Sequence, residues 1–124
     1  AIQYLTSSAN QNNVNSLCDL GNIYYEGLFV PRDIQKSIYY LTKSAKLNFG
    51  VGQLMLARIY CEGTYVPKDI KRGIYLLKLA LKNNVTPAAF SLGCIYENEV
   101  KNINKAIKYY LIGSEKMIMH LNWI

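Results

Sequence analysis

The feature that most constrains the fold of this chain is a segment that occurs twice. Residues 59–70 read IYCEGTYVPKDI, and residues 23–34 read IYYEGLFVPRDI, 36 positions earlier. Two near copies of a segment with Gly, Pro and Asp at fixed offsets indicate one structural unit used more than once. The chain is therefore expected to be a stack of repeats that bury their apolar faces against one another.

The period extends to a third copy, because Tyr24, Tyr60 and Tyr96 fall at the same 36-residue step. The third copy has a shorter loop: Tyr96 to Asn102 is 6 positions, whereas Tyr24 to Asp33 is 9. We expect three repeats at 13–48, 49–84 and 85–116, preceded at 1–12 by the second helix of a truncated repeat and followed at 117–124 by the start of another. The chain is thus expected to be a fragment of a longer protein.

Apolar residues recur at helical spacing in both halves of each repeat. A first helix is predicted over residues 14–26, because apolar residues stand at i, i+3, i+6 and i+7, at Leu17, Leu20, Ile23 and Tyr24. Second helices are predicted to start at Ile34, Ile70 and Ile103.

The turns between these helices carry their own signals. Gly27 and Gly63 follow the first helices, where a left-handed residue commonly ends a helix. Asp33 and Asp69 come directly before the second helices, as N-cap residues do, and Asn102 takes this place in the third repeat. The predicted fold is all-α: an α/α superhelix, or solenoid, of about three helix-turn-helix repeats.

Composition restricts the compartment and the class of protein. The three cysteines are an odd number without C-x-x-C spacing, which argues against a disulfide framework and a zinc site. We therefore expect a reducing compartment such as the cytoplasm. No apolar run approaches the roughly 20 residues of a membrane-spanning helix, so no membrane span is expected.

The unit L-G-x-x-Y-x-x-G-x-x-V-P-x-D, which begins at Leu20 and again in near form at Leu56, resembles the Sel-like repeat (SLR) family. This family is related to tetratricopeptide repeats and has longer loops. The third repeat departs from the pattern because it lacks the loop Gly and Pro, and Leu81 stands where the family prefers Ala. The resemblance implies a superhelix whose first helices line a concave wall. It also implies a non-catalytic adaptor that binds other proteins.

On this interpretation, the face of the first helices opposite the core lines a groove that binds a peptide or helix of a partner protein. The predicted groove residues are Cys18, Asn22, Tyr25, Leu54, Arg58, Cys61, Phe90, Cys94 and Glu97. They differ between repeats while the core positions do not, as a binding surface would if each repeat met a different part of the partner. The alternative is a solvated face that varies freely. Tyr25 is the candidate for an exposed aromatic anchor, since aromatic residues dominate binding hot spots; the alternative is a partly buried tyrosine with its hydroxyl in water.

No catalytic or cofactor-binding pattern is present. The only histidine, His120, has no nucleophile or carboxylate pair placed beside it by the sequence, and there is no P-loop, G-x-G-x-x-G or metal-ligand spacing. Glu26 and Glu62 recur as parts of equivalent helix ends. We therefore expect no enzyme activity, no metal and no cofactor.

Two other functions stay open at this point. The net charge of +6 comes mostly from lysines, many on the second helices, so this outer face could bind nucleic acid or an acidic membrane. Scarce arginine and the lack of a basic cluster with interleaved aromatics disfavour nucleic acid. The chain could instead be a regulatory part of a larger enzyme, such as a kinase or a ubiquitin-ligase complex. Apolar repeat ends could also cause self-association.

Overall fold

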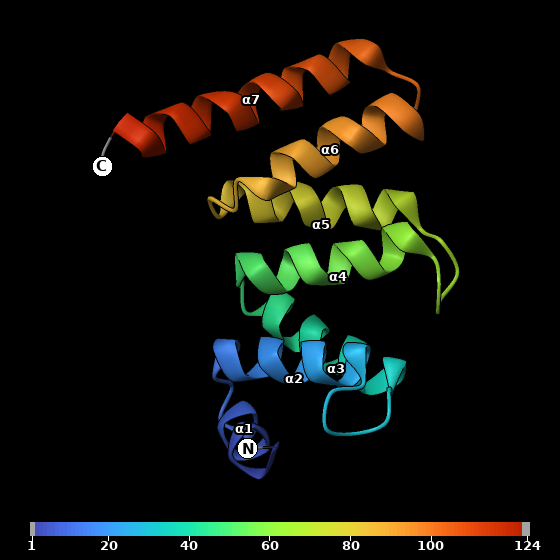
Figure 1. Ribbon diagram of the computed structural model, residues 1–124, viewed down its shortest axis with the longest axis vertical. Helices are drawn as coiled ribbons and strands as arrows, with labels where there is room; N and C mark the ends of the chain where they lie inside the picture. The colour runs from blue at the N-terminus through green and yellow to red at the C-terminus, as the bar shows by residue number, and fades with distance from the viewer. Residues whose placement is uncertain (1, 123–124) are drawn as a thin grey trace.

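The computed structural model describes residues 2–122, and it describes side chains for residues 2–119. All regular structure in this range is helical, which confirms the predicted fold class. The helices are α1 (Ile2–Asn10), α2 (Val14–Glu26), α3 (Ile34–Lys46), α4 (Gly50–Glu62), α5 (Ile70–Lys82), α6 (Pro87–Asn98) and α7 (Ile103–Asn122). Figure 1 shows them stacked, with the two ends of the chain at opposite ends of the stack.

The stack is a solenoid of helix pairs. Each helix packs mainly against the helices that precede and follow it in sequence, and α2 also contacts α4. The first helices of the three repeats are α2, α4 and α6, and the second helices are α3, α5 and α7, while α1 precedes the first complete pair. Contacts restricted to neighbouring units are typical of repeat proteins.

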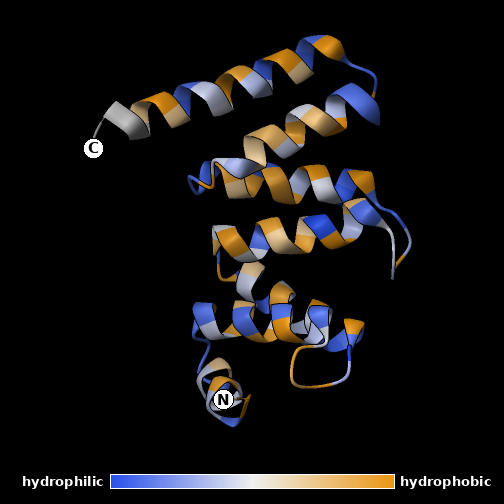
Figure 2. Cartoon of the chain, viewed as in Figure 1, coloured by the Kyte–Doolittle hydropathy of each residue, from blue (hydrophilic) through white to orange (hydrophobic). Residues whose placement is uncertain are grey.

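The core consists of the apolar stripes that face neighbouring helices, and every helix also carries hydrophilic residues (Figure 2). Leu20, Leu56 and Leu92, which are equivalent in the three repeats, are at most 4% exposed. Glycine lets the helices of a pair approach closely, because a Cβ on Gly21 would lie 2.5 Å from Cγ of Leu41. The missing side chain at Gly21 therefore allows α2 and α3 to pack closely.

Each first helix is joined to its second helix by the same closing contacts. In the second repeat, the Asp69 carboxylate accepts a hydrogen bond of 3.1 Å from the backbone N–H of Arg72, and the N–H of Asp69 donates to the carbonyl of Tyr60 at 2.9 Å. The guanidinium of Arg72 lies over the Tyr60 ring, 4.8 Å from its centroid. The same three contacts recur at Asp33, Lys36 and Tyr24 and at Asn102, Lys105 and Tyr96. The shorter third loop thus keeps the geometry of the other two, and the predicted N-caps are confirmed.

The C-terminal helix differs from the expectation that a new first helix begins at residue 117. α7 continues without a turn to Asn122; residues 123–124 lie outside the described range. The turns after α1, α3 and α5 each hold an asparagine in the left-handed region, at Asn12, Asn48 and Asn84, with φ of 62°, 64° and 66°. Met117 stands at the corresponding place. Methionine lacks the short polar side chain that stabilises asparagine there, so the helix continues.

One side of α7 is apolar and exposed. Ile103 and Ile107 are 56% and 50% exposed, whereas their counterparts Ile70 and Ile74 in α5 are partly buried against the core. The difference arises because α6 packs on that side of α5, and no described helix packs on the equivalent side of α7.

The loop glycines generate a stability prediction. Gly63 has φ of +63°, and a Cβ there would lie 2.6 Å from Cβ of Lys68. We expect Gly63→Val to lower the free energy of unfolding by at least about 1 kcal/mol, because a β-branched residue is strained in the left-handed region.

Urea unfolding followed by circular dichroism measures this change. The matched control is Thr64→Val, which introduces the same side chain at the next, exposed position, outside the left-handed region. The control should change the free energy of unfolding by no more than about 0.5 kcal/mol. Equal effects of the two substitutions would show that the conformation of Gly63 is not the cause.

Candidate functional site

The nine predicted groove residues form three rows across α2, α4 and α6, because each row repeats at the 36-residue step. The first row is Cys18, Leu54 and Phe90; the second is Asn22, Arg58 and Cys94; the third is Tyr25, Cys61 and Glu97. Residues four and seven positions apart lie on one side of a helix, so the three rows share a face.

The first row is largely part of the core. Cys18 and Leu54 are only 5% and 9% exposed, so the prediction that they face an open groove is wrong. The thiol of Cys18 lies 3.2 Å from the Ser44 hydroxyl and the same distance from where a Cβ on Gly52 would be, so it faces α3 and α4. Helix α4 of the next repeat therefore helps to cover Cys18. Phe90 is half-buried, with its ring against Gly113 of α7.

Because Leu54 is buried, a polar substitution at this position would disturb folding and would not measure partner binding alone. A carboxylate at this position would lose its hydration without gaining a partner, at a cost of several kcal/mol. Leu54→Asp therefore tests folding. Only the second and third rows, together with Phe90, offer side chains to a partner.

These two rows, except for Glu97, line two adjoining cavities. One, of about 120 Å³, lies between α2 and α4 and is lined in part by Asn22, Tyr25 and Arg58. The other, of about 360 Å³, lies between α4 and α6 and is lined in part by Arg58, Cys61, Phe90 and Cys94. Arg58 and Glu62 belong to both cavities, so the two form one surface, which we call the first-helix groove. Glu97 is exposed on the same row and accepts a hydrogen bond from the Tyr110 hydroxyl at 2.8 Å.

Tyr25 is held in place within this groove. Its hydroxyl donates to Oε2 of Glu62 at 2.8 Å, and its ring meets that of Tyr65 edge-on, with the centroids 5.7 Å apart. Burial, followed by the hydrogen bond to Glu62, raises the pKa of Tyr25 to about 12. The phenol is therefore a neutral hydrogen-bond donor at neutral pH, joined to α4, and the residue is half-buried.

Glu62 is one of the groove residues that sequence reasoning missed. Glu62 and Glu26 stand at equivalent helix ends in two repeats, and from the sequence both residues were explained as parts of that repeated helix end. The available signal was spacing: Glu62 is four residues after Arg58 on α4, so the two share a face. The groove thus combines a polar end at Asn22, Arg58 and Glu62 with an apolar end at Phe90 and Cys94.

The three cysteines are free thiols and differ in accessibility. Cys18 is buried, Cys61 is half-buried and Cys94 is exposed. Burial raises the pKa of the thiols of Cys18 and Cys61, which lowers their thiolate content at neutral pH.

Neither a metal-binding cluster nor a membrane-spanning helix is found among the described residues. Among them, no group of three His, Cys, Asp or Glu side chains is placed to hold a metal ion. None of the described helices combines the length and the apolar character needed to cross a lipid bilayer. The side chain of His120 lies outside the described residues.

Similar structures are known from several bacteria. A Sel1 repeat protein from Oxalobacter formigenes is 28% identical, with a TM-score of 0.85 over 93% of this chain and 48% of that one. The protein c5321, a protective antigen of uropathogenic Escherichia coli with an SLR fold, is 31% identical, with a TM-score of 0.84 over 93% of this chain and 25% of that one. The immunity protein Pa5087 from Pseudomonas aeruginosa, at 20% identity and a TM-score of 0.54 over 93% of this chain and 57% of that one, shares the fold alone.

This chain spans about half the length of the first of these proteins and a quarter of the second. No curated protein sequence matches it significantly. The family model for the Sel1 repeat matches residues 1–13, 14–49, 50–85 and 86–116, with the three full repeats each starting one residue later than expected from the sequence. Because these matches cover most of the chain, the protein belongs to the Sel1 repeat family.

Proposed function

We propose that this chain is a non-catalytic interaction module that holds a segment of a partner protein in the first-helix groove. Sel1 repeat proteins generally mediate protein–protein interactions. The observation that carries the proposal is that the groove is continuous over α2, α4 and α6, while its equivalent positions differ: Asn22, Arg58 and Cys94 in the second row. A constant frame with changing side chains is suited to binding one extended partner.

The chemistry of the groove indicates what such a segment contains. The cavity of about 360 Å³ beside Phe90 and Cys94 accommodates an apolar side chain. Exposed Arg58 offers a charge to a partner carboxylate, and Glu62, which already accepts from Tyr25, offers its carboxylate to a cation. The proposed ligand therefore has an apolar anchor next to residues of both charges.

The lysine-rich face of the second helices receives less support as a binding site for nucleic acid or acidic membrane. Many of its lysines lie over tyrosine rings of the same chain, at Lys36, Lys43, Lys78, Lys105 and Lys108. These contacts give the positive charges a role in packing that requires no external anion. Binding through this face would still weaken steeply with salt, which separates it from binding in the groove.

We also propose that the protein works in a reducing compartment such as the cytoplasm. The proposal is supported by three free thiols, of which Cys94 is exposed at the groove. An exposed thiol at a binding surface is open to oxidation where no reductant is present.

The groove proposal is tested by site-directed crosslinking. A benzophenone maleimide on Cys94, in a Cys61→Ser background, should crosslink one protein from the source-cell lysate. Arg58→Glu should lower the crosslinking yield at least about tenfold, because the groove would then place a negative charge against the partner carboxylate that pairs with Arg58. The yield is measured by mass spectrometry and blotting.

The matched control moves the same probe to the outer side of α5, with Lys71→Cys in a Cys94→Ser and Cys61→Ser background; Lys71 is exposed. This control should not crosslink the same protein. Crosslinking from the outer probe alone, or retention only of nucleic acid that is lost at high salt, would contradict the groove proposal.

Thiol reactivity provides a second test of the site. At pH 7.5, Ellman's reagent should modify Cys94 first, Cys61 at least about tenfold more slowly and Cys18 only when urea unfolds the protein, because burial limits both access and thiolate formation. Single Cys→Ser variants assign each phase. Modification of Cys18 as fast as that of Cys94 would show that the first row of the groove is open.

A further inference from the structure

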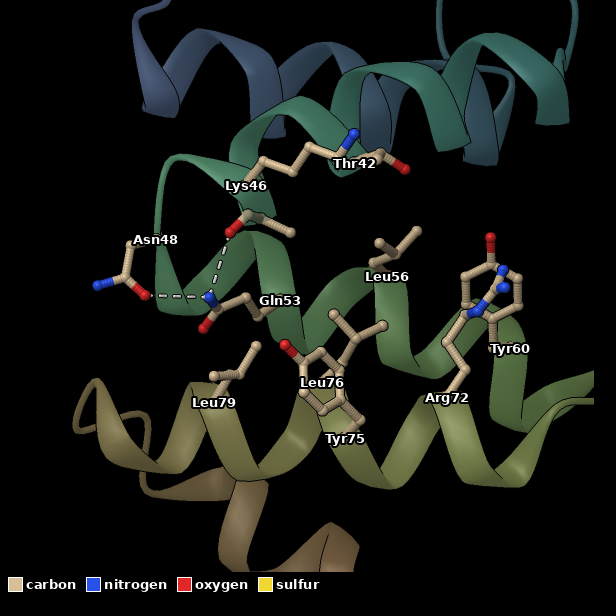
Figure 3. A pocket seen from close by; sticks show the side chains of 11 residues that line it. Thr42, Lys46, Asn48, Gln53, Leu56, Tyr60, Arg72, Tyr75, Leu76 and Leu79 are labelled. Atoms are coloured by element: carbon tan, nitrogen blue, oxygen red, sulfur yellow. Dashed lines mark hydrogen bonds between the residues drawn. The ribbon is translucent and has the colours of Figure 1, made fainter.

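A larger cavity lies on the other side of the molecule from the first-helix groove. It has a volume of about 490 Å³ and lies between α3 and α5, with α4 behind it. In Figure 3, Lys46 projects from α3, Leu56 and Tyr60 belong to α4, and Arg72, Tyr75 and Leu76 belong to α5. We call this cavity the α3–α5 pocket. Leu56 and Arg58 are about 200° apart around α4, so the pocket and the groove are on opposite faces of that helix.

The pocket exists because the second repeat lacks a tyrosine ring that is present in the first and third repeats. Tyr24 and Tyr96 each stack on a tyrosine of the following second helix, Tyr40 at 6.1 Å and Tyr109 at 5.5 Å between ring centroids. The equivalent residue beside Tyr60 is Leu76, whose side chain is smaller. The space that a stacked ring occupies in the first and third repeats is therefore open in the second.

A hydrogen-bond network found only in this repeat holds one end of the pocket. Gln53, which is 1% exposed, donates to the carbonyl of Ala45 at 3.2 Å and to Oδ1 of Asn48 at 3.3 Å, and its Oε1 accepts from Asn83 at 2.9 Å. The equivalent residues are Leu17 and Ala89, which cannot form it. Because Asn48 follows α3 and Asn83 follows α5, the network joins the ends of these two helices and fixes the width between them.

The rim of the pocket is positively charged and its lining is otherwise mostly apolar. Lys46 and Arg72 line it from opposite helices, and no acidic residue does. Beside the rim, a carboxylate oxygen of Asp69 lies 3.7 Å from Nε of Arg72, and both side chains of this pair are largely exposed. The polar atoms of Gln53 are already paired within the protein, so the charges that a ligand would meet in the pocket are those of Lys46 and Arg72.

From this geometry we propose that the α3–α5 pocket is a second binding site, which takes an aromatic side chain of an acidic peptide segment from a partner protein. The ring lies beside Tyr60, in the place that Tyr40 and Tyr109 take beside Tyr24 and Tyr96. Stacked rings are favoured at the centroid distances seen in those two pairs. Carboxylates on either side of the aromatic residue pair with Lys46 and Arg72. The site acts independently of the first-helix groove.

The probe for this proposal is a fluorescein-labelled peptide, acetyl-Asp-Glu-Phe-Glu-Asp, titrated with the full 124-residue chain and followed by fluorescence anisotropy. The Leu76→Tyr variant should bind it at least about tenfold more weakly, because the protein then supplies the stacked ring itself. A peptide with Ala in place of Phe should lose at least about tenfold in affinity, and Lys46→Glu should weaken binding at low salt.

Two controls separate loss of the site from loss of the fold. Ala45 lines the pocket from α3, and the equivalent residue in the next repeat is Leu81. Ala45→Leu should therefore narrow the pocket and weaken peptide binding, while thermal melting remains cooperative. Arg58→Glu, in the groove, should leave this affinity unchanged, so the two sites can fail separately.

Three results would overturn the proposal. They are failure of the peptide to bind, equal binding of the Phe and Ala peptides, and binding by the folded Leu76→Tyr and Ala45→Leu variants that is as tight as binding by the unmodified chain. Binding of phosphatidylserine vesicles that neither variant weakens would assign the positive rim to a lipid surface instead.

Discussion

The structure depends on the contact that closes each repeat at the end of its first helix. In the second repeat, the carbonyl of Tyr60 accepts a hydrogen bond from Asp69, and its ring lies under Arg72. The same contacts form in the other two repeats, although the third loop is shorter. Because the helices of every pair are joined in the same way, successive pairs stack regularly and their first helices form one continuous groove.

The same frame shows where repeats can differ without losing the fold. Replacing the stacked tyrosine by Leu76 leaves the hydrogen bond and the cation–π contact at Tyr60 intact, and it opens a cavity between α3 and α5. The network around Gln53 then holds that cavity open. Opposite faces of α4 therefore serve two surfaces of different chemistry: a groove with both charges and an apolar end, and a pocket with a positive rim.

The candidate groove could be predicted from the sequence only in part. Helical spacing placed the three rows on one face. Phe90 and all residues of the second and third rows except Glu97 line the cavities. Spacing within one helix cannot show how far the next repeat reaches, so Cys18 and Leu54 were expected in the groove although they are buried. Glu62 was overlooked because its recurrence had a structural explanation, and only the structure shows its hydrogen bond with Tyr25.

By itself, the sequence determined the all-α class, the repeat, the helix starts and the caps, because these follow from local rules: apolar periodicity, glycine in the left-handed region and carboxylate or amide caps. The tertiary structure decided which faces are covered and where cavities remain, because these depend on side chains from helices far apart in the chain. Tyr40, Leu76 and Tyr109 illustrate the difference. The three positions are easily aligned in the sequence, but that the leucine leaves a pocket follows only from the packing of α3, α4 and α5.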